Sequence, residues 1–263
     1  MTLPAYTAAG QGDTAVLLLH GVGGGRSIWL YAASAMASAL ARAGYRAVAI
    51  DFPGYGDSLG LPTLTAMVAS VTAMAAELRA RRLVLLGHSM GGMVAQEVMA
   101  CAPGLVQGLV LACTSAAFGK ADGAWQAQFL AERLAPLDAG LGMQGLAQRL
   151  VPGLVSPMAS AQATTLAMEI MGRVPEATYR VALPAIAGFD RRAALAAIAV
   201  PTLMLAAEHD RTAPPDVMRR MAERVAGAEF VCLAGAGHLA NLEAPQAFNA
   251  AVVSFLQRHF VNV

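Results

Sequence analysis

The sequence is poor in charged residues, in aromatic side chains and in cysteine. Only 13% of its 263 residues are charged, 6% are aromatic, and the formal net charge is +1. So small a charge creates no basic field, which argues against nucleic acid as a partner. Although 57% of the residues are hydrophobic, no run of 18 apolar residues occurs. We therefore expect no membrane-spanning helix and no membrane partner.

The three cysteines are Cys101, Cys113 and Cys232, an odd number, and each stands in an apolar stretch. This pattern favours buried free thiols in a reducing compartment over a disulfide framework. The first residues, Met1 to Pro4, lack the charged start and the apolar core of a signal peptide. We expect a soluble, cytoplasmic protein.

Apolar runs alternate with helix-forming stretches over most of the chain. The predicted strands are residues 15–19, 46–50, 83–86, 105–113, 201–207 and 229–233, and residues 1–13 supply a short strand or hairpin. The predicted helices are residues 31–43, 63–80 with Thr63 as N-cap, 93–101, 215–225 and 245–260. Strands that alternate with helices in this way predict a mostly parallel sheet covered by helices on both faces.

The alternation stops between Thr114 and Ala194. This stretch has helical patterning with scattered glycine and proline, and it is too long for a loop within a compact domain. We interpret residues 114–194 as a helical cap inserted above the sheet. The core would then comprise residues 1–113 and 195–263, a size that suits one large α/β domain.

The sequence Gly87-His88-Ser89-Met90-Gly91 follows an apolar strand and precedes a helix. A Gly-x-Ser-x-Gly in this context predicts a nucleophile elbow, in which a strained turn lifts the Ser89 hydroxyl above the sheet. Gly87 and Gly91 would be required because side chains there would collide with neighbouring elements. The pentapeptide alone also fits a glycine-rich turn that caps a helix, so the assignment depends on the strand and the helix around it.

A serine nucleophile needs a histidine base and a carboxylate that orients the base. Asp210 and His238 each follow a late strand, so both should project from the same sheet edge as Ser89. We predict Ser89, Asp210 and His238 as catalytic residues, in the chain order of this hydrolase architecture. The alternatives are a surface position for His238, a turn position for Asp210, and a rival orienting acid at Asp51, Asp57 or Asp190.

The early loop His20-Gly21-Val22-Gly23-Gly24-Gly25 exposes its backbone after a buried strand. An oxyanion hole takes one N–H from such a loop and one from the residue after the nucleophile, which predicts Val22 and Met90, with their side chains left to line the pocket. A phosphate cradle is the alternative, but the Lys-Ser/Thr of a P-loop is missing. We expect His20 and His88 to brace the elbow and this loop rather than to transfer protons. No cluster has metal-ligand spacing, so we expect neither a metal nor a cofactor.

These motifs together resemble the α/β-hydrolase superfamily. The matching segments are Leu-Leu-Leu-His-Gly at 17–21, Asp-Phe-Pro-Gly-Tyr-Gly-Asp-Ser at 51–58, Gly-His-Ser-Met-Gly-Gly at 87–92, Glu-His-Asp at 208–210 and Gly-His-Leu-Ala-Asn-Leu-Glu-Ala-Pro at 237–245. The resemblance implies the α/β-hydrolase fold, with a mostly parallel central sheet, helices on both faces and an inserted helical cap. It covers nearly the whole chain except the cap.

Within the superfamily the sequence looks most like small bacterial 3-oxoadipate enol-lactonases, haloperoxidase-like esterases and carboxylesterases. A serine at position 89 argues against dehalogenases and epoxide hydrolases, whose chemistry needs a carboxylate there. Carbon–carbon bond hydrolases usually carry an aromatic residue after the catalytic histidine and a Ser/Gly-Pro-Gly loop after His-Gly. Leu239 and the loop Val22-Gly23-Gly24-Gly25 depart from that pattern.

The expected activity is hydrolysis of a small carboxylic ester or lactone through an acyl-enzyme on Ser89. The alternatives are a carbon–carbon bond hydrolase with the same triad and a non-catalytic homologue that only binds a ligand. We expect Gly23, Trp125 and Leu239 to line the substrate pocket. The cap offers the cations Lys120, Arg133, Arg149, Arg173, Arg180, Arg191 and Arg192, but most should be solvated. The many apolar residues lead us to expect a preference for neutral esters.

Overall fold

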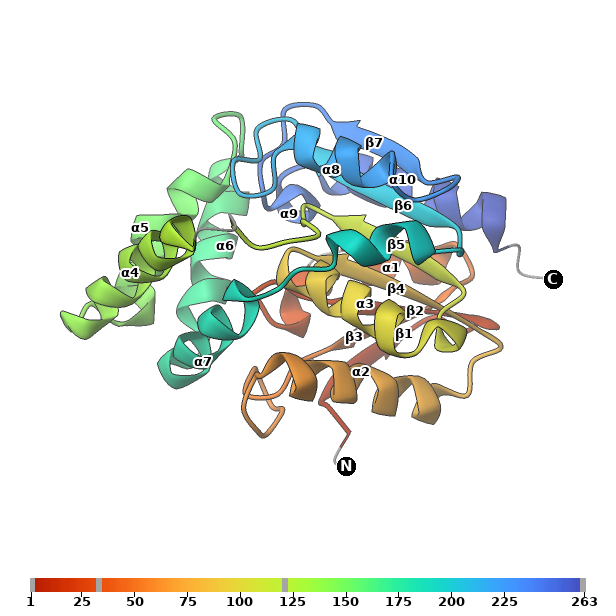
Figure 1. The fold of residues 1–263 in the computed structure, drawn as a ribbon, viewed down its shortest axis with the longest axis horizontal. Coiled ribbons are helices and arrows are strands. Elements are labelled where there is room, and N and C mark those ends of the chain that lie inside the picture. The colour runs from red at the N-terminus through yellow and green to blue at the C-terminus, as the bar shows by residue number, and fades with distance from the viewer. Residues whose placement is uncertain (1–2, 32–34, 120–122, 261–263) are drawn as a thin grey trace.

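A seven-stranded sheet forms the centre of the protein in a computed structural model that describes residues 3–31, 35–119 and 123–260 (Figure 1). Its strands are β1 (Tyr6–Ala9), β2 (Thr14–Leu19), β3 (Arg46–Ile50), β4 (Arg82–His88), β5 (Gly108–Ala112), β6 (Thr202–Ala207) and β7 (Glu229–Leu233). Their order is β1-β3-β2-β4-β5-β6-β7. Strand β1 pairs antiparallel with β3 and the other pairs are parallel, as the alternation of strands and helices predicted.

Helices cover both faces of the sheet. They are α1 (Met36–Arg42), α2 (Leu64–Leu78), α3 (Met90–Cys101), α8 (Pro215–Ala222), α9 (Ala240–Glu243) and α10 (Pro245–His259), with short 3-10 helices at Arg26–Trp29, Pro103–Leu105 and Arg192–Ala197. Alternate residues of β2 face opposite sides. Leu17 and Leu19 pack in the cluster that contains α2, α3 and α8, whereas Val16 and Leu18 pack in the cluster that contains α1 and α10.

Most boundaries agree with the sequence-based prediction to within two residues, and four differ by three or more. Two of these are the start of α3, at Met90 rather than at residue 93, and the end of α8, at Ala222 rather than at residue 225. Strand β5 begins at Gly108 rather than Leu105 because Pro103–Leu105 forms a 3-10 helix first. Helix α1 begins at Met36, and residues 32–34 of the predicted helix lie outside the described residues. Helix α2 starts as expected, since Thr63 Oγ1 accepts a hydrogen bond from Ala66 N at 3.2 Å. Among the helices of the described residues, none is long and apolar enough to cross a membrane.

The expectation of three buried thiols is wrong for two of the cysteines. Cys113 is buried, but Cys101 and Cys232 are exposed. Cys101 is the last residue of α3, where the helix leaves the core. Cys232 lies on β7, the last strand in the sheet order, which has a neighbouring strand on one side alone.

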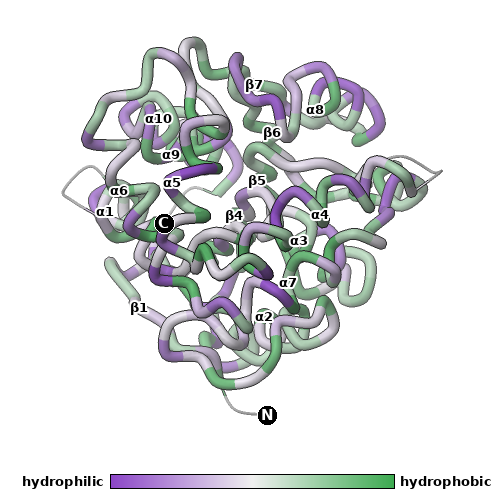
Figure 2. Tube along the Cα trace, turned by 90° about the vertical axis from the view of Figure 1, so that its left-hand side faces the viewer, coloured by the Kyte–Doolittle hydropathy of each residue, from purple (hydrophilic) through white to green (hydrophobic). Residues whose placement is uncertain are grey.

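Four helices are inserted between β5 and β6: α4 (Ala124–Asp138), α5 (Gly142–Leu154), α6 (Ala161–Gly172) and α7 (Glu176–Ala187). They gather beside one end of the sheet (Figure 1). In Figure 2, which faces this insertion, hydrophilic and hydrophobic stretches alternate along the helices, as expected for helices with one buried side. The inserted cap predicted from the sequence is therefore present; its treatment as a separate domain with the boundaries 114 and 194 stays a prediction.

The cap is hydrogen-bonded to the loop that follows β7. Leu154, the last residue of α5, accepts a hydrogen bond through its carbonyl oxygen from His238 N at 2.8 Å. Two residues later, Ser156 Oγ donates to the carbonyl oxygen of Gly235 at 2.6 Å. The chain that leaves α5 thus fixes the backbone position of His238.

Glu243 of α9 accepts hydrogen bonds from both segments of this junction, the chain after α5 and the loop that carries His238. Its Oε2 accepts hydrogen bonds from Ser156 N at 2.7 Å and from Gly237 N at 2.9 Å. Its Oε1 accepts one from Leu239 N at 3.0 Å. One carboxylate therefore satisfies three backbone donors, one in the cap and two that flank His238.

Replacing Glu243 by Gln should destabilise this junction. The amide nitrogen of Gln cannot accept a hydrogen bond, so at least one of the three backbone N–H groups loses its partner. We expect the free energy of unfolding in urea to fall by about 1–3 kcal/mol, the cost of a buried donor left unsatisfied. Glu223→Gln, a change at an exposed site, is the matched control. Equal stability of the two variants would contradict the role of Glu243.

Candidate active site

Ser89 occupies a strained backbone conformation between β4 and α3. Its φ of 53° and ψ of −118° lie outside the regions that a residue with a side chain normally adopts. Hydrogen bonds on both sides hold this turn: Ser89 N donates to Ala112 O at 3.0 Å, and Thr114 Oγ1 donates to Ser89 O at 2.7 Å. The turn has the conformation expected of a nucleophile elbow.

The glycines that flank Ser89 are required by close packing. A Cβ atom on Gly87 would collide with the carbonyl oxygen of Gly91, and one on Gly91 would collide with the carbonyl oxygen of Leu19 in β2. Neither obstacle can move easily, because both are backbone atoms of packed elements. The collisions predicted for side chains at these two positions are therefore confirmed.

Ser89, His238 and Asp210 form a continuous chain of hydrogen bonds. The Ser89 Oγ and His238 Nε2 atoms are 3.0 Å apart, and His238 Nδ1 lies 2.8 Å from Asp210 Oδ2. Each residue follows a parallel strand, β4, β6 or β7, at the same edge of the sheet. Because a carboxylate only accepts, Nδ1 carries the proton in this pair and Nε2 is left to accept the hydroxyl proton of Ser89.

The carboxylate of Asp210 is held in its charged form. Its Oδ1 accepts hydrogen bonds from Thr212 N at 2.7 Å and Ala213 N at 2.9 Å. Burial by itself raises the pKa of Asp210. The neighbouring His238 and the accepted hydrogen bonds outweigh burial and hold the pKa below its usual value. Asp210 is therefore ionised at neutral pH and orients the imidazole of His238.

His88, the residue before Ser89, contacts both the backbone and the ring of His238. His88 Nε2 donates to the carbonyl oxygen of His238 at 2.7 Å, and the two rings lie 5.1 Å apart. Burial lowers the pKa of His88 to about 4, with the nearby His238 acting in the same direction. His88 is therefore neutral at pH 7 and acts as a fixed hydrogen-bond donor.

The loop after β2 presents a backbone donor beside Ser89. His20 Nδ1 donates to the Gly21 carbonyl oxygen at 2.8 Å and His20 Nε2 accepts from Phe52 N at 3.1 Å. In a trans peptide the C=O and N–H groups point in opposite directions, so the Val22 N–H points away from His20. Tyr55 Oη fixes the next peptide by donating to Val22 O at 3.0 Å.

The N–H groups of Val22 and Met90 have no hydrogen-bond partner among the described residues. Met90 is the first residue of α3, where backbone donors lack an acceptor within the helix. The two segments flank Ser89 closely, since a Cβ atom on Gly21 would lie 3.3 Å from Ser89 Cβ. Two unpaired donors are thus available beside the hydroxyl.

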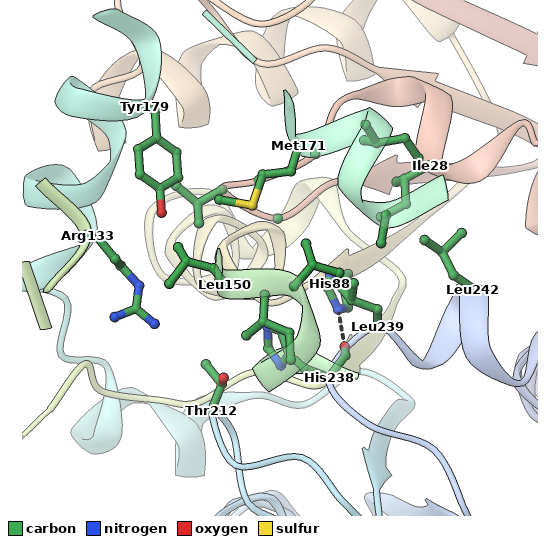
Figure 3. A pocket seen from close by; sticks show the side chains of 18 of the residues that line it. Ile28, His88, Arg133, Leu150, Met171, Tyr179, Thr212, His238, Leu239 and Leu242 are labelled. Carbon is green, nitrogen blue, oxygen red and sulfur yellow. Dashed lines mark hydrogen bonds between the residues drawn. The ribbon is translucent and has the colours of Figure 1, made fainter. Parts of the chain in front are cut away.

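A cavity of about 80 Å³ lies between the sheet edge and the cap (Figure 3). Most of its wall is apolar, with Leu150, Leu154, Ile170, Met171, Leu239 and Leu242 among the lining residues. The polar side chains in the wall are His88, His238, Tyr179, Thr212 and Arg133. The cavity is therefore a small, mostly apolar site with a few polar groups, as binding sites for small molecules commonly are.

Two of the three predicted pocket residues, Gly23 and Leu239, line this cavity. Trp125 does not line the cavity itself, so its place in the substrate pocket stays a prediction. It is 39% exposed and lines an adjoining outer depression, where its ring stacks on Phe129 at 5.2 Å. The side chain of Met90 is also absent from the wall. It is fully buried, because the first turn of α3 points it into the core.

The rival acids have other partners. Asp51 and Asp57 both bind Arg26, and Asp190 binds Arg192. No pattern in the sequence separates Arg133 from the other cap cations or marks Tyr179, although both line the cavity. Among the residues that the structure describes, no three His, Cys, Asp or Glu side chains are grouped so that they could hold a metal ion.

Comparison with known proteins agrees with this geometry. The chain is 28% identical, over 96% of its length and 98% of the relative, to the pimeloyl-[acyl-carrier protein] methyl ester esterase of Pectobacterium carotovorum. It is 30% identical, over 97% of its length, to the dihydrolipoyllysine-residue acetyltransferase component of the acetoin cleaving system of Pseudomonas putida. The match spans 66% of that longer protein.

A solved structure of an enol-lactonase is also similar to this chain. The enol-lactonase from Burkholderia xenovorans LB400 superposes with a TM-score of 0.81 at 25% identity, covering 96% of this chain and 95% of that one. The resemblance to esterases and enol-lactonases found in the motifs is thereby confirmed. The family model for the alpha/beta hydrolase family matches residues 16–251. This chain belongs to the alpha/beta hydrolase family.

Proposed function

We propose that the protein is a serine hydrolase that cleaves small carboxylic esters or lactones through an acyl-enzyme on Ser89. The observation that carries the proposal is the hydrogen-bond chain from Ser89 Oγ through His238 to Asp210, at distances of 3.0 and 2.8 Å. Such a chain supplies a nucleophile, a base and an orienting acid in one place.

In the first half-reaction Ser89 Oγ attacks the carbonyl carbon while its proton passes to His238 Nε2. The resulting tetrahedral intermediate then collapses. The bond between the carbonyl carbon and the leaving oxygen breaks, and the proton on Nε2 passes to that oxygen. Asp210 stabilises the imidazolium that exists between the two transfers.

The negative charge on the former carbonyl oxygen needs donors that are already in place. Val22 N–H and Met90 N–H are unpaired and flank Ser89, which suits them to form an oxyanion hole. Loss of one such donor typically costs about 10²- to 10³-fold in kcat. In the second half-reaction a water molecule gives a proton to His238 Nε2 and attacks the acyl carbon. The bond between that carbon and Ser89 Oγ then breaks, Oγ takes the proton from Nε2, and the carboxylic acid leaves.

Two other functions are separable from this one. A carbon–carbon bond hydrolase with the same triad would act on dienone substrates. A non-catalytic homologue would bind ligands without turning them over. A panel of p-nitrophenyl esters, lactones and dienones distinguishes the three, because the proposal predicts turnover of the first two classes.

Ser89→Ala should abolish turnover and leave the fold intact. Without Oγ there is no nucleophile, and loss of a triad serine typically lowers kcat by about 10⁴- to 10⁶-fold. The measurement is ester hydrolysis, together with labelling by an organophosphonate followed by intact mass. The wild-type chain should take up one phosphonyl group, and the variant none.

Ser254→Ala, at an exposed position on α10, is the matched control and should label and turn over like the wild type. A Ser89→Ala preparation that retained activity within tenfold of the wild type would rule out Ser89 as the nucleophile.

Asp210→Asn should lower kcat by about 10⁴-fold, because the amide favours the wrong tautomer of His238. His20 and His88 should not change the rate between pH 5 and 8, since burial lowers the pKa of each to about 4 and both are neutral throughout that range.

Asp190→Asn, at an exposed rival acid, is the control for this prediction and should keep wild-type kinetics. Stopped-flow or steady-state rates across pH 5–8 provide the measurement. If Asp190→Asn lost activity and Asp210→Asn did not, the orienting acid would have been misassigned.

A further inference from the structure

Arg133 of α4 is the one formally charged side chain among the described residues that line the cavity. Its side chain is 16% exposed. Leu150, Met171 and other apolar residues surround the same space, and Figure 3 shows the guanidinium pointing toward it. A cation in an apolar wall is costly unless an anion accompanies it.

Within the described residues this cation is poorly paired. Its Nη1 donates one hydrogen bond, to the Phe129 carbonyl oxygen at 3.3 Å, and the guanidinium carbon lies 3.4 Å from the centre of the Phe129 ring. The single carboxylate within 4.0 Å is Glu132, at 4.0 Å. Glu132 is 57% exposed and its Oε1 accepts a hydrogen bond from Gln128. Most of the five guanidinium donors are therefore unused.

The other described cap arginines lie elsewhere or are paired. Arg173 is 74% exposed and lies 3.8 Å from Glu169, Arg180 binds Asp138 and Glu176, Arg191 binds Glu97, and Arg192 binds Asp190. Arg149 lines the outer depression. Lys120 lies outside the described residues. Among these cations, Arg133 alone combines burial, a weak ion pair and a place in the cavity wall.

Tyr179 of α7 adds a second donor next to Arg133. Its side chain is buried, and its hydroxyl points toward the same part of the cavity as the guanidinium (Figure 3). The hydroxyl makes no hydrogen bond to another described residue. Burial raises the pKa of Tyr179 to about 12, against a smaller opposing effect of Arg133. Tyr179 therefore keeps its proton at neutral pH and can donate it.

We propose that Arg133 and Tyr179 bind a carboxylate group carried by the substrate. The substrate class would then be half-esters of dicarboxylic acids, or lactones that bear a free acid. This inference rests on the proposed ester or lactone hydrolysis and names its specificity. The flat fork of arginine can hold both oxygens of a carboxylate, and the bound acid supplies the anion that the site lacks. This proposal differs from the expectation of a neutral substrate, which was based on the apolar residues of the cap.

The test compares two matched substrates: phenyl hydrogen adipate, which carries a carboxylate, and the phenyl ester of adipic acid monoamide, which is uncharged and of nearly equal shape. In the wild type kcat/KM should favour the acid by about tenfold or more, as charge-assisted hydrogen bonds imply. Arg133→Gln should abolish this preference by lowering kcat/KM for the acid much more than kcat/KM for the amide.

Three further variants sharpen the result. Arg133→Lys keeps the charge without the fork and should retain part of the preference. Tyr179→Phe should reduce the preference by a smaller factor. Arg173→Gln removes an exposed cap arginine outside the cavity wall and should change nothing.

A binding measurement makes the result independent of turnover. Calorimetry of free adipate with Ser89→Ala should detect binding that disappears in the Ser89→Ala, Arg133→Gln double variant. The carboxylate proposal is wrong if the wild type hydrolyses both esters equally, if Arg133→Gln keeps the preference or slows both esters alike, or if adipate binds both calorimetric samples equally. Absence of turnover and of phosphonate labelling on Ser89 would instead refute the hydrolase proposal, while adipate binding would still decide the carboxylate site.

Discussion

At Gly91 the backbone of α3 passes so close to Leu19 of β2 that no side chain fits between them. The same close approach at Gly87 brings β4 and α3 together and leaves Ser89 on a turn with a positive φ. Strain of this kind persists when the surrounding structure over-determines it. Here parallel pairing of β4 with β2 and β5 supplies that surrounding structure.

The remaining parts of the site are arranged around the elbow by hydrogen bonds between loops. His20 and Tyr55 orient the peptides next to Val22, and His88 donates to the backbone of His238. Glu243 holds the segments on both sides of His238 and the end of α5. Cap and core are thus coupled at the histidine, so the shape of the cavity and the position of the proposed base depend on the same junction.

The sequence was sufficient for the fold, the inserted cap and the spatial grouping of Ser89, His238 and Asp210. These features follow from local patterns: buried strands read as apolar runs, and parallel strands deliver their following loops to one edge. The wall of the cavity was less predictable. Trp125 looked like a pocket residue by type, yet α4 presents Phe129 and Arg133 to the cavity and leaves Trp125 outside. Which side of a cap helix faces inward depends on packing between helices that short motifs do not encode.

The proposed hydrolysis requires that Ser89 becomes acylated during turnover. Its most direct test is acid quenching of the enzyme during steady-state hydrolysis of a phenyl ester, followed by proteolysis and mass spectrometry of the peptide that contains residue 89. This peptide should gain the mass of the acyl group, and Asp210→Asn should change how much of the acylated peptide accumulates. Turnover at the wild-type rate with no acyl group on Ser89, or with the acyl group on another residue, would contradict this requirement.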